Sequence, residues 1–153
     1  MKQEYYRITD PGLRKTLRNV FGEENGTYSL HWFDRGKPRG ICRSMGIDCD
    51  GILYIGKTET PLYKRISSLQ DSVLTNSERT LLKPVERGHK TLSKKFFRIR
   101  KRIEIGDLFV SAQITKASPK KDESFRLDKY ASVYGELPPL NGDYGEYAHW
   151  ELF

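Results

Sequence analysis

The sequence predicts an α/β (α+β) fold in which helices flank a small, three-stranded, mixed antiparallel sheet. Three observations support this prediction. Residues 27–33 alternate between apolar and polar side chains as a half-buried strand does, and residues 51–56 form a short apolar run that ends at a glycine. Apolar residues recur at helical spacing in several other segments. The predicted order of elements is α, β, β, α, α, β, α, and 153 residues suit one domain.

The first predicted helix covers residues 10–22. Asp10 is a candidate N-cap, Pro11 suits the first turn and Gly22 can end the helix. Its apolar stripe consists of Leu13, Leu17, Val20 and Phe21.

The strands over 27–33 and 51–56 are expected to pair as an antiparallel hairpin. Tyr28 faces the same side as Leu30 and Trp32, and the period of two places Ile52 with Tyr54 and Leu53 with Ile55. Residues 34–50, rich in glycine and charge, are predicted to form a long loop.

The second half of the chain is predicted to hold three helices and one strand. The helix over 60–74 is capped by Thr60 and buries Leu62, Ile66, Leu69 and Val73, with Arg65 on the edge of that stripe. Residues 75–90 form a loop, 90–105 a helix, 107–115 a strand, 118–135 a helix and 136–145 a proline-rich turn.

Basic residues concentrate in one segment of a chain whose net charge is +7. Residues 83–102 hold nine basic residues and one acid, which is the footprint expected of a protein that binds a polyanion. A solvated helix face accounts for the charge equally well. The residues predicted to bind nucleic acid are Lys90, Lys94, Lys95, Arg98, Lys101 and Arg102.

Several classes of protein are disfavoured. Two cysteines, Cys42 and Cys49, are too few for a disulfide framework and poorly spaced for zinc. No apolar run approaches the roughly 20 residues that cross a bilayer, and the first residues lack a secretory signal pattern. We therefore expect a cytoplasmic protein without a membrane partner.

A phosphodiester site would account for four polar residues around the predicted hairpin. Hydrolysis of a phosphodiester needs a group that activates or positions water, cations for the developing charge and, usually, a divalent metal on a carboxylate. Tyr28, Tyr54, Lys57 and Arg65 could supply the first two, with Lys57 favouring a tyrosine phenolate. Glu123 is a plausible single carboxylate for Mg²⁺, which keeps most of its waters.

The same residues give the chain a resemblance to the GIY-YIG nucleases over about residues 26–142. Gly26-Thr27-Tyr28 stands at the first motif, with Thr27 in place of isoleucine, and Tyr54-Ile55-Gly56 is the second motif. The run YIGKT…LYKR is similar to the nuclease module of nucleotide excision repair proteins. Glu123 and the Asn141 of GELPPLN follow in the family's order.

The resemblance implies a GIY-YIG-like fold and a DNA endonuclease with one Mg²⁺ or Mn²⁺ ion. By this resemblance Tyr28 activates water, Tyr54 positions water or phosphate, and Arg65, helped by Lys57, binds the scissile phosphate. Glu123 would hold the metal, and Asn141 would brace the site. Leu69 occupies a position where many members carry histidine or tyrosine, and His89 is our candidate replacement.

Plainer interpretations of these residues remain open. The tyrosines could be half-buried strand residues, Arg65 could pair with Asp71 or Glu59, and Glu123 could be a first-turn acid favoured by the helix dipole. The rival functions are a non-catalytic nucleic-acid-binding module and a protein-interaction domain.

The expected organisation is an N-terminal helical extension over 1–25, the nuclease-like domain over 26–142 and a tail over 143–153 packed on it. A homodimer or a partner protein would have to supply specificity.

Overall fold

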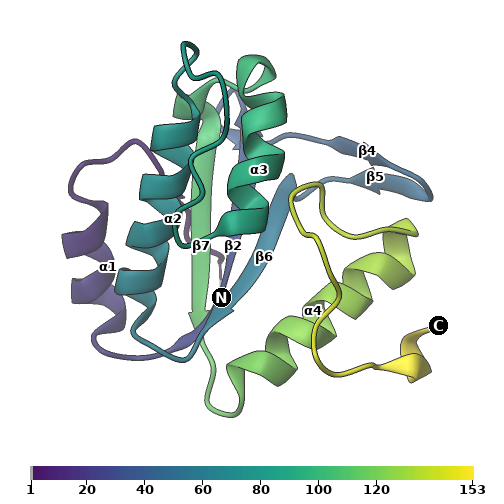
Figure 1. Ribbon diagram of the computed structural model, residues 1–153. Coiled ribbons are helices and arrows are strands. Elements are labelled where there is room, and N and C mark those ends of the chain that lie inside the picture. The colour runs from purple at the N-terminus through teal and green to yellow at the C-terminus, as the bar shows by residue number, and fades with distance from the viewer. Residues whose placement is uncertain (1) are drawn as a thin grey trace.

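A five-stranded antiparallel sheet forms the centre of the molecule (Figure 1). The computed structural model describes residues 2–153. Central strand β2 (Gly26–Asp34) pairs with β6 (Ile52–Thr58) on one side and with β7 (Leu108–Ile114) on the other. The two short strands are β1 (Tyr6–Arg7), which pairs with β7, and β3 (Lys37–Pro38), which pairs with the end of β2.

The three strands predicted from the sequence are present and antiparallel, as expected, but two further short strands, β1 and β3, make the sheet five-stranded, and it is not mixed. All strand pairings in the described residues are antiparallel. The helical segments between β6 and β7 return the chain so that β7 runs against β2, just as β6 does on the other side.

Four helices cover the two faces of this sheet. They are α1 (Leu13–Phe21), α2 (Leu62–Asn76), α3 (Lys90–Ile99) and α4 (Pro119–Tyr134). Figure 1 shows α1, α2 and α3 gathered together, with α4 apart from them beyond β6. The main core joins apolar residues of α1, α2 and α3 to one face of the sheet, and a smaller cluster joins Leu127 and Tyr130 of α4 to Ile55.

Helix periodicity predicted most of the buried positions correctly. Leu62, Ile66, Leu69 and Val73 of α2 are all buried. Val20 of α1 is an exception, with 51% of its surface exposed. The cap predicted for α2 is also wrong, because Pro61 takes the N-cap position and the Thr60 hydroxyl hydrogen-bonds to that of Thr58.

The segment 34–50 is not the single long loop that was expected. It contains β3 and a separate hairpin of β4 (Ile41–Arg43) and β5 (Gly46–Asp48). This hairpin contacts the C-terminal end of α4, where the Met45 amide donates to the Tyr134 carbonyl and the Ser44 amide to the Glu136 carboxylate.

Helix α3 is shorter than the predicted 90–105. It ends at Ile99, and 3-10 turns follow at Arg100–Arg102 and Ile105–Asp107. Leu92 and Phe96 are buried as the periodicity predicted, and so is Ile103, which lies beyond the helix. Lys101 and Arg102 therefore lie on a turn and do not continue the charged face of the helix.

An irregularity in β6 alters the predicted faces of that strand. The register between β2 and β6 shifts at Leu30 and His31, which pair with Tyr54 and Ile52, so that Leu53 is left over. Leu53 and Tyr54 consequently both pack in the main core, whereas Ile52 and Ile55 pack against α4. The strict alternation assumed from the sequence fails because a bulge inserts one extra residue.

Helix α4 covers polar as well as apolar residues of the sheet. Thr27, Ser29 and His31 lie on the face of β2 opposite Tyr28 and Leu30, and each is at most 1% exposed. Thr27 donates to the carboxylate of Asp122 (2.6 Å), and Arg126 donates to the hydroxyl of Ser29 (2.6 Å). These contacts satisfy buried polar groups that would otherwise destabilise the fold.

The N-terminal residues pair with the sheet, and the C-terminal residues pack on α4. Residues 6–7 form β1 at the sheet edge, so the N-terminal segment is not purely helical as predicted. Residues 143–153 lie along α4 and end in a 3-10 turn at Trp150–Leu152. Among residues 2–153, none of the helices combines the length and apolar character that a bilayer crossing requires.

Candidate nuclease-like site

Strand register brings the two predicted tyrosines to the same face of the sheet. Tyr28 pairs with Gly56 across β2 and β6, and Leu30 pairs with Tyr54 two residues along. The tyrosine rings lie with centroids 6.2 Å apart. A Cβ on Gly56 would be 2.7 Å from Tyr28 Cζ and from Tyr54 Cε1, so the absence of a side chain leaves room for both rings.

Arg65 reaches this tyrosine pair from the first turns of α2. Its Nε donates to the Tyr28 hydroxyl over 3.3 Å. The surface pairings that were considered from the sequence do not occur, because Asp71 pairs with Arg87 and Glu59 with Lys57. Within residues 2–153 the terminal nitrogens of Arg65 have no recorded hydrogen bond or ion pair, which leaves them able to bind an anion.

His89 enters the cluster from the start of α3. Its Nε2 lies 2.7 Å from the Tyr28 hydroxyl, and its ring centroid is 6.0 Å from those of both tyrosines. Gly88 allows this approach, because it has φ +55° and a side chain there would collide with Ser68 of α2. His89 thus brings a polar group to the two tyrosines, whereas Leu69 of α2 is an apolar residue of the main core.

The hydrogen bonds between Arg65, Tyr28 and His89 indicate which atom carries each proton. Burial, followed by the charge of Arg65, lowers the pKa of His89 to about 3, so the imidazole is neutral at pH 7. Arg65 donates to the Tyr28 oxygen, and that hydroxyl can donate to His89 Nε2. The imidazole proton then lies on Nδ1, a buried atom without a hydrogen-bond partner in the described residues.

Burial keeps both tyrosines protonated. It raises the pKa of Tyr28 well above its usual value, and it raises that of Tyr54, where the charge of Glu123 adds to the effect. The expectation that Lys57 favours a phenolate is therefore wrong, since desolvation of the anion dominates. Tyr28 is 0% exposed, whereas Tyr54 is only partly buried, so water reaches Tyr54 more easily.

Glu123 is the carboxylate of α4 that acts on the tyrosine cluster. Burial raises the pKa of Glu123, and the charge of Glu146 acts in the same direction. Lys57 and Arg65 oppose this effect by stabilising the carboxylate. Lys57 also lies 3.9 Å from Glu59, so its ammonium pairs with that acid while its charge acts on Glu123.

Asn141 braces the second motif from the turn that follows α4. Its side-chain amide donates to the Ile55 carbonyl and accepts from the Ile55 amide, both at 2.9 Å. It is 7% exposed, and Lys95 Nζ donates to its backbone carbonyl over 2.6 Å. Asn141 therefore fixes the backbone between Tyr54 and Gly56.

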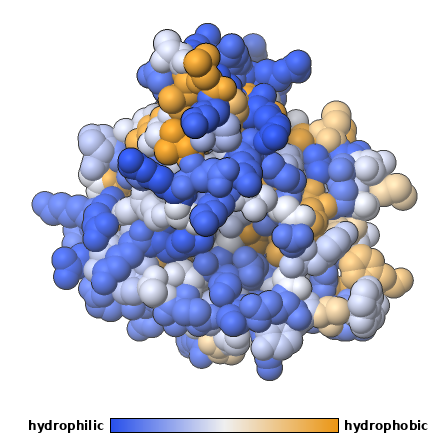
Figure 2. All heavy atoms as spheres, viewed as in Figure 1, coloured by the Kyte–Doolittle hydropathy of each residue, from blue (hydrophilic) through white to orange (hydrophobic). Residues whose placement is uncertain are grey.

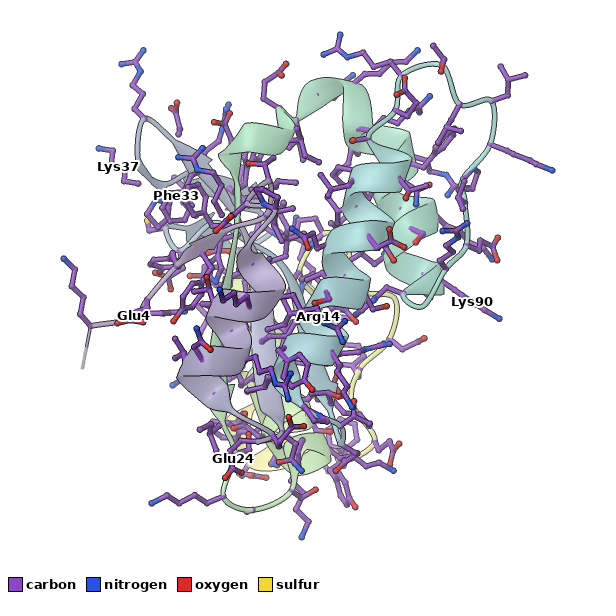
Figure 3. The ribbon with its side chains drawn as sticks, turned by 90° about the vertical axis from the view of Figure 1, so that its left-hand side faces the viewer. Glu4, Arg14, Glu24, Phe33, Lys37 and Lys90 are labelled. Atoms are coloured by element: carbon purple, nitrogen blue, oxygen red, sulfur yellow. The ribbon has the colours of Figure 1, made fainter. Side chains whose placement is uncertain are left out.

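The predicted nucleic-acid-binding residues divide into two groups. Lys95 has a structural partner in Asn141, Lys94 lies 3.4 Å from Glu86, and Arg98 donates to the Lys94 carbonyl. Lys90, Lys101 and Arg102 are exposed, and within residues 2–153 their side chains form no hydrogen bond or ion pair. Lys90 extends away from the body of the molecule in Figure 3, and hydrophilic residues cover most of the face shown in Figure 2.

Contacts between Tyr28, Tyr54, Arg65 and His89 define the candidate site. Three hollows, of about 550, 400 and 540 Å³, have walls that do not include the site residues Tyr28, Tyr54, Arg65, His89 and Glu123. The concave patch that was expected at these residues does not coincide with any of the three.

Two residues near the site were not identified from the sequence. Arg126 lies one turn after Glu123 and borders two of the hollows, and Glu146 acts electrostatically on Glu123. The spacing of Glu123 and Arg126 on α4 could have indicated the first. No local pattern could have indicated Glu146, because its position depends on how the C-terminal segment folds back.

Comparison of the chain with protein-family models, curated proteins and solved structures gave no significant match.

Proposed function

We propose that the protein is a metal-dependent DNA endonuclease that hydrolyses phosphodiester bonds through a GIY-YIG-like site. The main support is the convergence of Tyr28, Tyr54, Arg65 and His89 from two strands, a helix and a loop, with Glu123 close enough to affect both tyrosines. If the two tyrosines served only to pack the sheet, there would be no reason for a buried histidine to bond to one of them. Nor would there be a reason for the terminal nitrogens of Arg65 to lack a protein acceptor within residues 2–153.

The geometry favours a particular division of roles. Arg65 is held by Tyr28 through Nε and directs its terminal nitrogens to the scissile phosphate. Tyr28 and His89 position Arg65, since Tyr28 has no exposed surface through which to meet water. Tyr54 orients the attacking water as a neutral hydroxyl, because its raised pKa disfavours the phenolate.

The residues present fit a Mg²⁺ or Mn²⁺ ion that keeps several waters. Glu123 would hold it as a single carboxylate, and no group of three His, Cys, Asp or Glu side chains suited to a metal occurs in residues 2–153. Mg²⁺ is commonly bound by one or two carboxylates together with substrate phosphate. A bound cation would supply positive charge for the phosphoryl oxygens. The raised pKa of Glu123 indicates a carboxylate that a cation would stabilise.

A non-catalytic nucleic-acid-binding module is the second candidate. The complete burial of Tyr28 favours it, because a tyrosine sealed by two partners can be purely structural. The exposed basic residues would bind the phosphate backbone both in a nuclease and in a non-catalytic binding module. The two functions differ only in whether bound DNA is cut.

Cleavage assays with supercoiled, linear and single-stranded DNA test the proposal. Wild type and Arg14→Ala should cut at least one form with Mg²⁺ or Mn²⁺, whereas Arg65→Ala should be slower by about 100-fold or more. Arg14 is a matched control because it is exposed on α1. DNA binding without cleavage by any variant would favour the second candidate, and equal cleavage by Arg65→Ala would exclude this site.

A further inference from the structure

The C-terminal strap, residues 143–153, lies along α4 beside the candidate site. Figure 1 shows this yellow segment crossing in front of α4. Two contacts fix it to Ser124, the residue after Glu123. The backbone of Gly145 lies so close to Ser124 that a Cβ would be 2.5 Å from Ser124 Cα, and the Tyr147 amide donates to the Ser124 hydroxyl over 3.2 Å.

Side chains of the strap interact with two lysines in the first turns of α4. Glu146 forms an ion pair with Lys120 at 3.4 Å, and the Lys121 ammonium lies 5.6 Å from the centre of the Tyr147 ring. Lys120 and Glu123 are three positions apart on one helix, so their side chains are neighbours. Without the strap, the ammonium groups of Lys120 and Lys121 would be free to bind the phosphates on either side of a phosphodiester bond placed at Glu123.

The charge of the strap opposes that of a nucleic acid. It carries three acidic side chains, Asp143, Glu146 and Glu151, and no lysine or arginine. Glu146 also raises the pKa of Glu123, which is consistent with two carboxylates that are close together. A phosphate backbone beside α4 would be repelled by Glu146 and would lose two potential cationic partners.

The strap is docked shallowly. None of residues 143–153 is buried, and its large side chains remain exposed: Tyr144 by 57%, Tyr147 by 42%, Trp150 by 78% and Phe153 by 66%. Besides the Ser124 contacts, the Asp128 carboxylate accepts from the His149 amide over 2.8 Å. An exposed ion pair such as Lys120–Glu146 contributes about 0–1 kcal/mol. The strap is otherwise held by the Ser124 contacts and by His149, whose Nδ1 also lies 3.2 Å from the Asp128 carboxylate.

We propose that the C-terminal strap competes with nucleic acid for Lys120, Lys121 and the surface beside Glu123, and therefore restrains the site until it is displaced. This inference rests on the proposed function, because it takes DNA as the substrate at that site.

Single substitutions test this competition without removing any residue. Gly145→Ala should displace the strap, since the new Cβ meets the backbone of α4, and Glu146→Gln removes one repelling charge and leaves the chain path unchanged. Gly106→Ala is the control, because a Cβ there meets nothing within 4 Å. Circular dichroism confirms folding, and faster chymotryptic cleavage after Tyr147 or Trp150 reports that the strap is released.

Binding is measured by anisotropy of a short fluorescent DNA duplex in EDTA, so that no cleavage occurs. We expect Gly145→Ala and Glu146→Gln to bind roughly two- to tenfold more tightly than wild type and Gly106→Ala. The dependence of log K on log salt should steepen by about 0.9 for each lysine that gains a phosphate in Gly145→Ala.

The outcomes separate this inference from the proposed function. If wild type binds DNA and neither strap variant binds more tightly, the competition is refuted while the nuclease proposal stands. If the variants bind and wild type does not, the competition is supported in its strongest form. If no variant binds at low salt, DNA is not the ligand and both proposals fail.

Discussion

A methyl group added to Gly56 should disturb the candidate site more than its size suggests. In Gly56→Ala the new Cβ would be 2.7 Å from the Tyr28 hydroxyl, from Tyr28 Cζ and from Tyr54 Cε1. An ordinary contact is at least 3.4 Å, so the rings or the strand must move by about 0.7 Å. Overpacking of this kind costs about 1–3 kcal/mol.

The displacement should affect function as well as stability. The Tyr28 hydroxyl holds both Arg65 and His89, so a moved ring lengthens bonds that are now 3.3 and 2.7 Å. A misplacement of about 1 Å at a reacting group can cost roughly 100-fold in rate. We expect the melting temperature to fall by about 2–12 °C, since a chain of this size loses about 2–4 °C per kcal/mol and the overpacking costs about 1–3 kcal/mol.

Thermal denaturation and single-turnover DNA cleavage measure the two effects, with Gly106→Ala as the control for adding a methyl group. A Gly56→Ala protein that matches the control in both assays would refute the close packing described here. A loss of stability with full cleavage would show that the position of Tyr28 does not matter for the reaction.

Three further predictions follow from the same contacts. Asn141→Leu should lower the unfolding free energy by about 2–5 kcal/mol in urea titrations, because it leaves the Ile55 amide and carbonyl unsatisfied, and a loss below about 1 kcal/mol would contradict the bracing role. His89 stays neutral in the folded protein (pKa about 3), whereas the unfolded chain binds its proton below about pH 6.5. Its contribution to stability is therefore complete above pH 6.5 and decreases by up to about 1.4 kcal/mol per pH unit as the pH falls toward 3. Urea titrations at several pH values should show that His89→Gln removes this part of the slope, and an unchanged slope would show that His89 is not held neutral. Lys90→Gln and Lys101→Gln should each reduce the salt dependence of DNA binding by about 0.9, whereas Lys95→Gln should mainly lower stability, and equal salt effects of all three would contradict the division of the basic residues.

The helical parts of the fold could be predicted from periodicity because one helix face meets one core. Leu62, Ile66 and Leu69 recur at the spacing of α2, and all three are buried. The ends of helix α4 were equally predictable, because Ser118 caps it through the Lys121 amide and Gly135 ends it with a left-handed conformation. In both cases the signal is local in sequence.

The sheet was harder to predict, since its details depend on partners far along the chain. The β1 strand is two residues long and is defined by β7, and the bulge at Leu53 is defined by its pairing with β2. The β4–β5 hairpin lies within a stretch rich in glycine and charge, where strand propensity is weak.

The candidate site was predictable in its residues but not in its chemistry. Tyr28, Tyr54, Arg65 and His89 do meet, and Asn141 makes the bracing contacts that were expected. The burial of Tyr28 could not be predicted, because α2, α3 and β6 enclose it only in the folded protein. That burial reverses the expected effect on the tyrosine pKa, and it is the reason that the proposed function assigns the water-positioning role to Tyr54.

The role of Glu123 is the most direct test of the nuclease proposal. Single-turnover cleavage is measured against Mn²⁺ concentration for wild type, Glu123→Gln and Glu104→Gln, an exposed acid that pairs with Arg79. The proposal predicts that Glu123→Gln loses cleavage by about 100-fold or more, or needs far more metal, while Glu104→Gln behaves as wild type. Equal rates and equal metal dependence for Glu123→Gln and wild type would contradict the proposed metal site.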